Sequence, residues 1–174
     1  MHDAPDVLLL EDFVSDADAL FHGLRAEVPW DERMFARKTA SYGTPYNYAQ
    51  ISYDPAPMHP RIAPVLEELV VRLGFRYDNC LLNLYEHGGH GMGFHVDDMT
   101  GLVGEAGVAI VSLGAPRTLV FQRIGDKAHT AAFRLHGGSL LWTPAAVQAA
   151  WKHGLPAEPG AGPRISMTFR ATAR

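Results

Sequence analysis

The stretch Gly107-Val108-Ala109-Ile110-Val111-Ser112-Leu113 decides the fold class, because its side chains from Val108 to Val111 are all apolar. A run so short and so apolar is typical of a strand that is covered on both faces. After residue 77 the chain carries further short runs of β-forming residues, and Gly, Pro or Asp clusters separate most of them. These predicted strands span residues 79–85, 93–96, 117–122, 130–135, 139–142 and 164–170.

Two helical segments are predicted before the strands. Ser15, followed by Asp16 and Asp18, predicts an N-cap and an acidic first turn. A second helix is expected over residues 60–73, where apolar side chains recur at helical spacing and Gly74 is placed to end it.

The order of these elements predicts the architecture. Residues 33–58 have no helical period and are expected to form strands and loops that cover one end of a barrel. Helices followed by about eight strands predict a mainly β fold with flanking helices (α+β), namely a double-stranded β-helix, or jelly roll, with the helices packed outside. We expect one domain over residues 1–174, in which residues 1–76 supply the helical support and a lid and residues 77–174 supply the jelly-roll core.

The composition is that of an ordinary globular protein. The 174 residues are 47% hydrophobic and 20% charged, which argues against disorder. The net charge of −4 and the pI near 6.1 disfavour a dedicated duplex-DNA binder, which usually carries a basic face.

The compartment is expected to be cytoplasmic. The single cysteine, Cys80, permits no internal disulfide and suits a reducing compartment. The N-terminus lacks the basic start of a signal peptide, and the apolar run at residues 7–10 is too short to span a bilayer. We therefore expect a monomer with no membrane partner.

The chemistry is indicated by His95-Val96-Asp97, which follows a glycine-rich turn. In a strand, residues two apart point to the same side, so His95 and Asp97 can bind one ion. His153, far downstream, adds a second imidazole. Two histidines and one carboxylate are the ligand set that holds non-haem Fe(II) and leaves positions open for oxygen and a co-substrate. Taken alone, the His-x-Asp pair is more simply a polar strand edge.

Polar residues on two other predicted strands fit a co-substrate. Arg164 and Arg170 are an even number of residues apart and project to one face of the last strand. A buried arginine needs an anionic partner, which a dicarboxylate can supply, although two surface arginines at a sheet end are an equal alternative. Asn83 and Tyr85 also share a strand face and offer an amide and a phenol to carboxylate oxygens.

Together these constellations occur in the order seen in the AlkB-like family of Fe(II)/2-oxoglutarate dioxygenases, which the chain resembles over most of its length. They are Asn83-Leu84-Tyr85, His95-Val96-Asp97, Trp151-Lys152-His153 and Arg164-Ile165-Ser166-Met167-Thr168-Phe169-Arg170. The stretch Arg37-Lys38-Thr39-Ala40-Ser41-Tyr42-Gly43 is similar to the segment that leads into the nucleotide-recognition lid of the animal nuclear DNA-repair members.

The resemblance implies a metal, a co-substrate and a reaction. Fe(II) would be bound by His95, Asp97 and His153. The residues that would hold 2-oxoglutarate are Arg164 on the distal carboxylate, Asn83 and Tyr85, and Arg170 near the metal-side carboxylate. The implied reaction consumes O2 and 2-oxoglutarate and releases succinate and CO2. An N-alkyl carbon on a nucleobase is hydroxylated, and the product collapses to formaldehyde and the free base, which is a DNA-repair activity.

The resemblance also implies substrate contacts. Tyr46 and Tyr48 match the lid aromatics, so either can stack on a flipped base; the alternative is a pair of half-buried strand tyrosines. Arg37 and Lys38 are candidate phosphate contacts.

One position departs from the family pattern. Many nucleic-acid members carry an acidic residue two positions after the metal-binding Asp, where it can accept a hydrogen bond from the exocyclic amine of a base. Met99 occupies that position here, and the neighbouring Asp98 is the candidate substitute.

Three functions are therefore weighed. The first is a dealkylase of alkylated bases in DNA or RNA. The second is a 2-oxoglutarate oxygenase that hydroxylates or demethylates a small molecule or a protein side chain, which the negative charge and Met99 favour. The third is a non-enzymatic jelly-roll binding module, which leaves the arginines together with Asn83 and Tyr85 unexplained.

Overall fold

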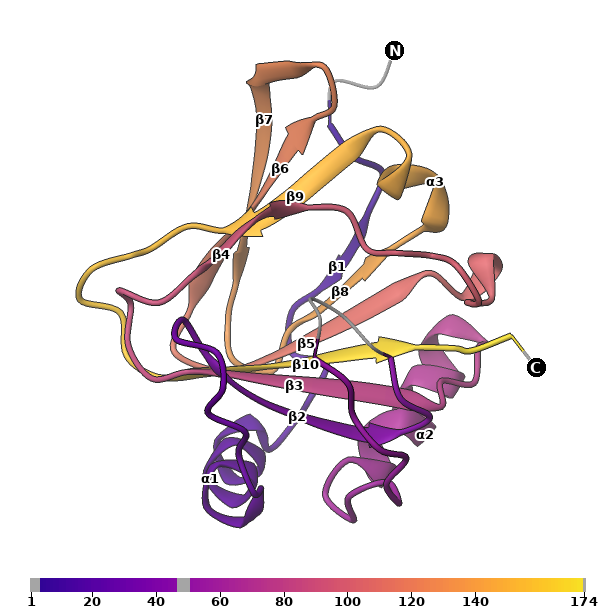
Figure 1. Cartoon of the computed structure of the whole chain (residues 1–174), viewed down its shortest axis with the longest axis vertical. Coiled ribbons are helices and arrows are strands. Elements are labelled where there is room, and N and C mark those ends of the chain that lie inside the picture. Colours follow the sequence, from indigo (N-terminus) through magenta and orange to yellow (C-terminus); the bar gives the residue numbers. More distant parts are fainter. Residues whose placement is uncertain (1–3, 47–50, 174) are drawn as a thin grey trace.

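The computed structural model describes residues 4–46 and 51–173 and bears out the mainly β prediction. Its strands form two antiparallel sheets packed as a jelly roll, one of six strands in the order β1-β8-β5-β10-β3-β2 and one of four in the order β4-β9-β6-β7 (Figure 1). The larger sheet contains β1 (Leu8–Leu10), β2 (Lys38–Gly43), β3 (Asn79–Tyr85), β5 (Val108–Gly114), β8 (Leu140–Thr143) and β10 (Arg164–Arg170). The smaller sheet contains β4 (Met92–His95), β6 (Arg117–Arg123), β7 (Asp126–Leu135) and β9 (Trp151–Leu155).

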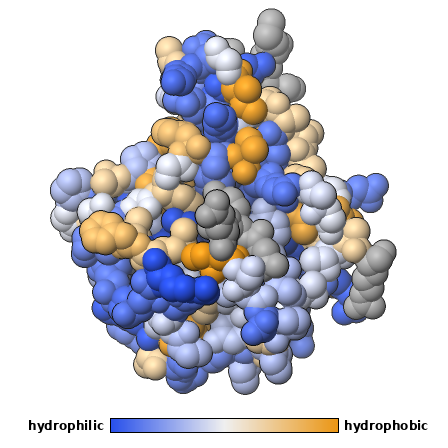
Figure 2. Space-filling model, viewed as in Figure 1, coloured by the Kyte–Doolittle hydropathy of each residue, from blue (hydrophilic) through white to orange (hydrophobic). Residues whose placement is uncertain are grey.

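The two long helices cover the outer face of the larger sheet (Figure 1). They are α1 (Ala17–Glu27) and α2 (Ala63–Leu73), and two shorter helical turns, η1 (Gly104–Ala106) and α3 (Ala145–Gln148), lie in loops of the barrel. In the same view, the outer surface over the helices is mostly hydrophilic (Figure 2). Within the part of the chain that is described, no helix is long and apolar enough to cross a membrane.

The helix boundaries correct two expectations. The N-cap of α1 is Asp16 and not Ser15, and its side chain makes no capping hydrogen bond, whereas the acidic first turn is present as predicted, with Asp18. The second helix begins three residues later than expected, because residues 60–62 form a turn before Ala63. Its predicted end is correct: Gly74 is the C-cap, with a φ of 78° that favours glycine.

Alternation along β10 separates the packing residues from the polar ones. Ile165, Met167 and Phe169 belong to the core between the larger sheet and the helices. The intervening residues line a pocket between the sheets, and they are Arg164, Ser166, Thr168 and Arg170. Strand β5 is buried on both faces from Val108 to Val111, as the apolar run predicts.

Three parts of the sheets are not predicted by the sequence. β1 is only three residues long and is held by its pairing with β8. β9 contains Lys152, His153 and Gly154, which have low strand propensity, and is held between β4 and β6. β7 begins at Asp126 rather than residue 130, because a tight turn at Gly125, with a φ of 87°, starts the pairing with β6 at once.

Residues 33–46 form the expected combination of strand and loop. β2 is an edge strand of the larger sheet and pairs with β3. The chain beyond it brings the ring of Tyr46 against Arg170, one of the residues that line the inter-sheet pocket. Tyr48 lies outside the described residues.

Two substitutions in α2 test the packing of the helices on the sheet. Leu69 is 0% exposed, so Leu69→Ala should lower the free energy of unfolding by about 2–5 kcal/mol through lost burial and a residual cavity. Val71 is 76% exposed, so Val71→Ala should change it by less than about 0.5 kcal/mol. Urea unfolding of the two variants measures both, and equal losses would contradict the packing described.

Candidate metal centre

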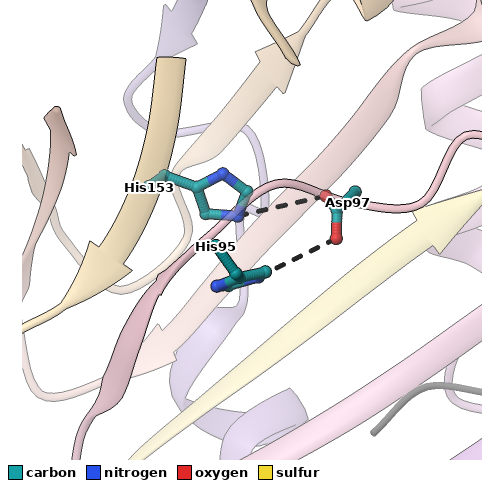
Figure 3. Close-up of side chains that lie close together, drawn as sticks. All are labelled: His95, Asp97 and His153. Carbon is teal, nitrogen blue, oxygen red and sulfur yellow. Dashed lines mark ion pairs between the residues drawn. The ribbon is translucent and has the colours of Figure 1, made fainter. Parts of the chain in front are cut away.

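Three ligand-type side chains, from two strands and a turn, meet at one point between the sheets (Figure 3). His95 is the last residue of β4 and pairs with His153 of β9, so their side chains project to the same side. Oδ1 of Asp97 is 4.0 Å from Nε2 of His95, and Oδ2 of Asp97 is 3.9 Å from Nε2 of His153. One ligand atom of each residue lies within 4.8 Å of the other two, which is close enough for all three to bind one ion.

The alternation of side chains along β4 does not explain the position of Asp97. β4 ends at His95, so the premise that His95 and Asp97 share a strand face is wrong. Two side chains hold the carboxylate instead. The guanidinium of Arg170 donates to Oδ1 over 2.8 Å, and the amide of Gln148 lies 3.4 Å from Oδ2. The predicted convergence is nevertheless observed.

The protonation states of the cluster suit a divalent metal. Burial raises the pKa of Asp97, but Arg170, His153 and His95 together lower it by more, so this pKa lies below its usual value. Burial lowers the pKa of His153 to about 4, against the opposing effect of Asp97. At neutral pH the two residues are an ionised carboxylate and a neutral imidazole, which are the forms that bind metals.

The backbone orients the ring of His95. Its Nδ1 lies 2.9 Å from the carbonyl oxygen of Gly93. Because a carbonyl oxygen only accepts, Nδ1 carries the proton in this contact, and Nε2 is the ring nitrogen on the side of Asp97. Metal-binding histidines are commonly held in this way.

A buried arginine lies in the pocket beside the cluster. Arg164 donates to Oγ of Ser112 over 2.9 Å, while its Nε has no hydrogen-bond partner among the described residues. Its guanidinium lies 5.6 Å from the centroid of the Tyr85 ring. Burial lowers the pKa of Arg164 to about 10, so it stays charged at neutral pH. A buried guanidinium with an unused donor is suited to bind a carboxylate of a ligand.

The other predicted co-substrate residues line the same pocket. Asn83 and Tyr85 project from β3 beside Arg164, with Asn83 opposite Ser166 of β10. Arg170 lies at the metal cluster, where its Nε and Nη1 have no hydrogen-bond partner in the described part of the chain. The structure therefore brings all four of these residues together with the three ligand-type side chains.

The predicted substrate residues do not all lie in one place, and two of them contact residues that line the pocket. The ring of Tyr46 stacks on the guanidinium of Arg170 at 3.9 Å, and its hydroxyl accepts from the backbone N–H of Asp98 over 3.0 Å. Arg37 is buried in the pocket wall and donates to Oδ1 of Asn83 over 2.9 Å, a position that faces the pocket rather than a surface phosphate.

Two predicted substrate residues lie outside the pocket. Lys38 is on the surface, 2.7 Å from a carboxylate oxygen of Glu32. Asp98 is exposed, and its carboxylate accepts from the backbone N–H of Thr100 over 2.9 Å. Met99 packs against the core between the sheets.

Three residues near the site are not among the site residues predicted from the sequence. Ser112 was foreseeable from alternation, because it faces inward on β5 opposite Ser166. Arg117 is buried, and its guanidinium lies 5.8 Å from the centroid of the Tyr85 ring. Gln148 carries no signal in the sequence, because its contact with Asp97 depends on how α3 packs against the turn after β4.

Comparison with known proteins assigns the class. Residues 7–170 match the sequence profile described as the 2OG-Fe(II) oxygenase superfamily, and the chain belongs to that family. Membership of an enzyme family argues against the non-enzymatic binding module.

Two relatives and one solved structure are similar to the chain over most of its length. The chain is 31% identical to the alpha-ketoglutarate-dependent dioxygenase alkB homolog 3 of Bos taurus and 30% identical to that of Homo sapiens, over 90% of this chain in each case. It spans 62% of the length of these relatives. The solved structure of OsALKBH1 superposes with a TM-score of 0.71 at 15% identity, over 95% of this chain and 98% of that one, which confirms the predicted fold.

The residues present fit the cofactors of the family, which are Fe(II), 2-oxoglutarate and O2. The two histidines and Asp97 are the donor set expected for non-haem Fe(II). The unused Nε of Arg164 fits a ligand carboxylate, because an unpaired charge in a fully buried position is otherwise costly.

The metal centre is tested by Asp97→Asn, which keeps the shape of the side chain but removes its charge. We expect Co(II) affinity, measured by titration with visible absorption, to fall by more than about 100-fold, because a ligand is lost rather than one of its hydrogen-bond partners. The matched control is Asp98→Asn, whose carboxylate faces solvent and should leave the affinity unchanged. Equal effects of the two substitutions would show that the cluster does not bind the metal.

The co-substrate pocket is tested by Arg164→Gln. We expect 2-oxoglutarate affinity, measured by calorimetry with Mn(II) present, to fall at least about 30-fold, because truncating one partner of a buried charge pair costs about 2–5 kcal/mol. The control Arg123→Gln removes an arginine that lies on the Trp151 ring outside the pocket. Unchanged affinity in Arg164→Gln would place the dicarboxylate elsewhere.

Proposed function

We propose that the chain is an Fe(II)/2-oxoglutarate-dependent dioxygenase that removes N-alkyl groups from bases in DNA or RNA, with release of succinate, CO2 and formaldehyde. The observation that carries the proposal is the placement of the His95, Asp97 and His153 cluster in one pocket with the buried guanidinium of Arg164. Three protein ligands leave coordination positions for a co-substrate and O2, and the buried guanidinium of Arg164 beside them suits an anionic co-substrate.

Each residue has a distinct task in this proposal. His95, Asp97 and His153 bind Fe(II). Arg164 binds the distal carboxylate of 2-oxoglutarate, helped by the amide of Asn83 and the phenol of Tyr85, and Arg170 lies near the metal-side carboxylate. When bound, iron and 2-oxoglutarate supply the activation of O2 and the hydroxylation of the substrate carbon. The protein contributes orientation, and it keeps Asp97 ionised through Arg170.

Nucleic acid is the proposed substrate because of the relatives and the lid. The relatives named alkB homolog 3 and the segment from Arg37 to Tyr46 support it, and a DNA-repair role follows from the same reasoning. A flipped base would enter beside Tyr46, whose ring now lies on Arg170. Tyr48 is proposed as the second aromatic of the lid. Arg37 would contact the occupant of the pocket, while Lys38 and Asp98 would act from the rim.

The setting of the enzyme is also proposed. Residues 1–174 would act as one catalytic domain and as a monomer. The cytoplasm is the proposed compartment, because its reducing conditions suit the buried free thiol of Cys80.

A hydroxylase or demethylase of a small molecule or a protein side chain is the second candidate. The observation that favours it is the rim of the pocket, where Asp98 is directed at Thr100 and Met99 packs into the core. Among the described residues that line the pocket, Asp97 is the only acid, so no free carboxylate is placed to accept from the exocyclic amine of a base.

Succinate formation against a panel of substrates separates the two candidates. We expect turnover that depends on 1-methyladenine or 3-methylcytosine in an oligonucleotide, with formaldehyde in equal amount. Unmodified oligonucleotides of the same sequence and the free alkylated nucleosides are the controls. Uncoupled succinate formation with no response to any alkylated base would reject the nucleic-acid dealkylase and favour the second candidate.

A further inference from the structure

Gln148 makes two hydrogen bonds to one residue of the metal cluster. Its Oε1 accepts from the backbone N–H of Asp97 over 3.0 Å, and its Nε2 donates to Oδ2 of Asp97 over 3.4 Å. Gln148 is 7% exposed and is the last residue of α3. One amide therefore contacts both the main chain and the carboxylate of Asp97.

The orientation of the amide follows from its partners. The backbone N–H of Asp97 can only donate, so the oxygen of the Gln148 amide must face it. The NH2 group then faces Oδ2, which accepts. Each end of the amide meets a group of the required kind, so one rotamer satisfies both contacts.

Asp97 needs such a support because the sheet does not provide it. The pairing of β4 with β9 ends at His95 and His153 and already contains an irregularity between Met92 and His95. Residues 96–101 belong to no strand, and side chains from other segments contact the carboxylate instead. Arg170 of β10 donates to Oδ1 over 2.8 Å, and Gln148, at the end of α3, contacts Oδ2 and the backbone N–H.

Gln148 connects the segment before His153 to the segment after His95. α3 ends at Gln148, and β9, which carries His153, begins at Trp151. A contact from Gln148 to Asp97 therefore ties the segment that leads into His153 to the turn that follows His95. Hydrogen-bond partners of this kind orient metal ligands and commonly change metal affinity by about 10- to 100-fold when removed.

We propose that Gln148 is a positioning residue that fixes the carboxylate of Asp97 for metal binding. The inference rests on the proposed metal centre and deepens it. Gln148 itself neither binds the metal nor lines the pocket that holds the cluster and Arg164.

The test compares Gln148→Met with Val147→Ala. The first keeps side-chain length and removes both hydrogen bonds, while the second truncates the neighbouring buried residue of α3 and leaves the amide in place. Titration with Co(II) alone measures affinity, and the visible absorption of bound Co(II) reports ligand geometry. Thermal unfolding of the metal-free proteins measures stability separately.

We expect Gln148→Met to weaken Co(II) binding by about 10- to 100-fold and to alter the absorption of the bound ion. Val147→Ala should lower stability and leave both the affinity and the absorption as in the wild type. The control Gln122→Met, whose amide donates to the Lys127 carbonyl on β7, away from the metal cluster, should resemble the wild type in all three measurements.

Wild-type affinity and absorption in Gln148→Met would overturn the inference while leaving the metal centre standing. Losses of similar size in Gln148→Met and Val147→Ala would also overturn it, because α3 would then act only through stability. Failure of the wild type to bind Co(II) would reject the metal centre and the inference together.

Discussion

The buried ion pair between Arg170 and Asp97 is the interaction on which the rest of the site depends. Both side chains are almost fully buried, and their atoms are 2.8 Å apart. Arg170 belongs to the larger sheet and Asp97 follows the last residue of β4 in the smaller one, so the pair joins the sheets at the metal cluster. Removing either partner would leave a buried charge alone, at a cost of about 3–5 kcal/mol. The ring of Tyr46 lies over the same guanidinium, so this tyrosine also contacts the pair.

Side chains alternate between the two faces of β3 and β10, so that one face packs in the core and the other lines the pocket. The outer faces of these strands carry Leu82, Leu84, Ile165, Met167 and Phe169, which pack beneath the helices. Their inner faces carry the polar and charged side chains of the pocket. A central strand of the larger sheet can therefore hold two buried arginines without loss of its core, because the opposite face supplies the apolar burial.

The parts of the fold that were predictable from sequence are those with a local pattern. The apolar run of β5, the even spacing of Arg164 and Arg170, and the glycine that ends α2 all depend on neighbours in the chain. β9 and the contacts of Gln148 depend on partners far away in sequence, and their residues carry no matching propensity. The convergence of His95, Asp97 and His153 was predictable from the order of the sequence motifs. The hydrogen bonds of two other side chains to Asp97 were not.

The most direct test of the account is a crystal structure with Mn(II) and 2-oxoglutarate, with the metal located by anomalous diffraction. The account predicts one metal within about 2.0–2.3 Å of Nε2 of His95, Nε2 of His153 and a carboxylate oxygen of Asp97. It also predicts the distal carboxylate of 2-oxoglutarate against the guanidinium of Arg164. A metal bound elsewhere, or a pocket in which Arg164 receives no carboxylate, would contradict it.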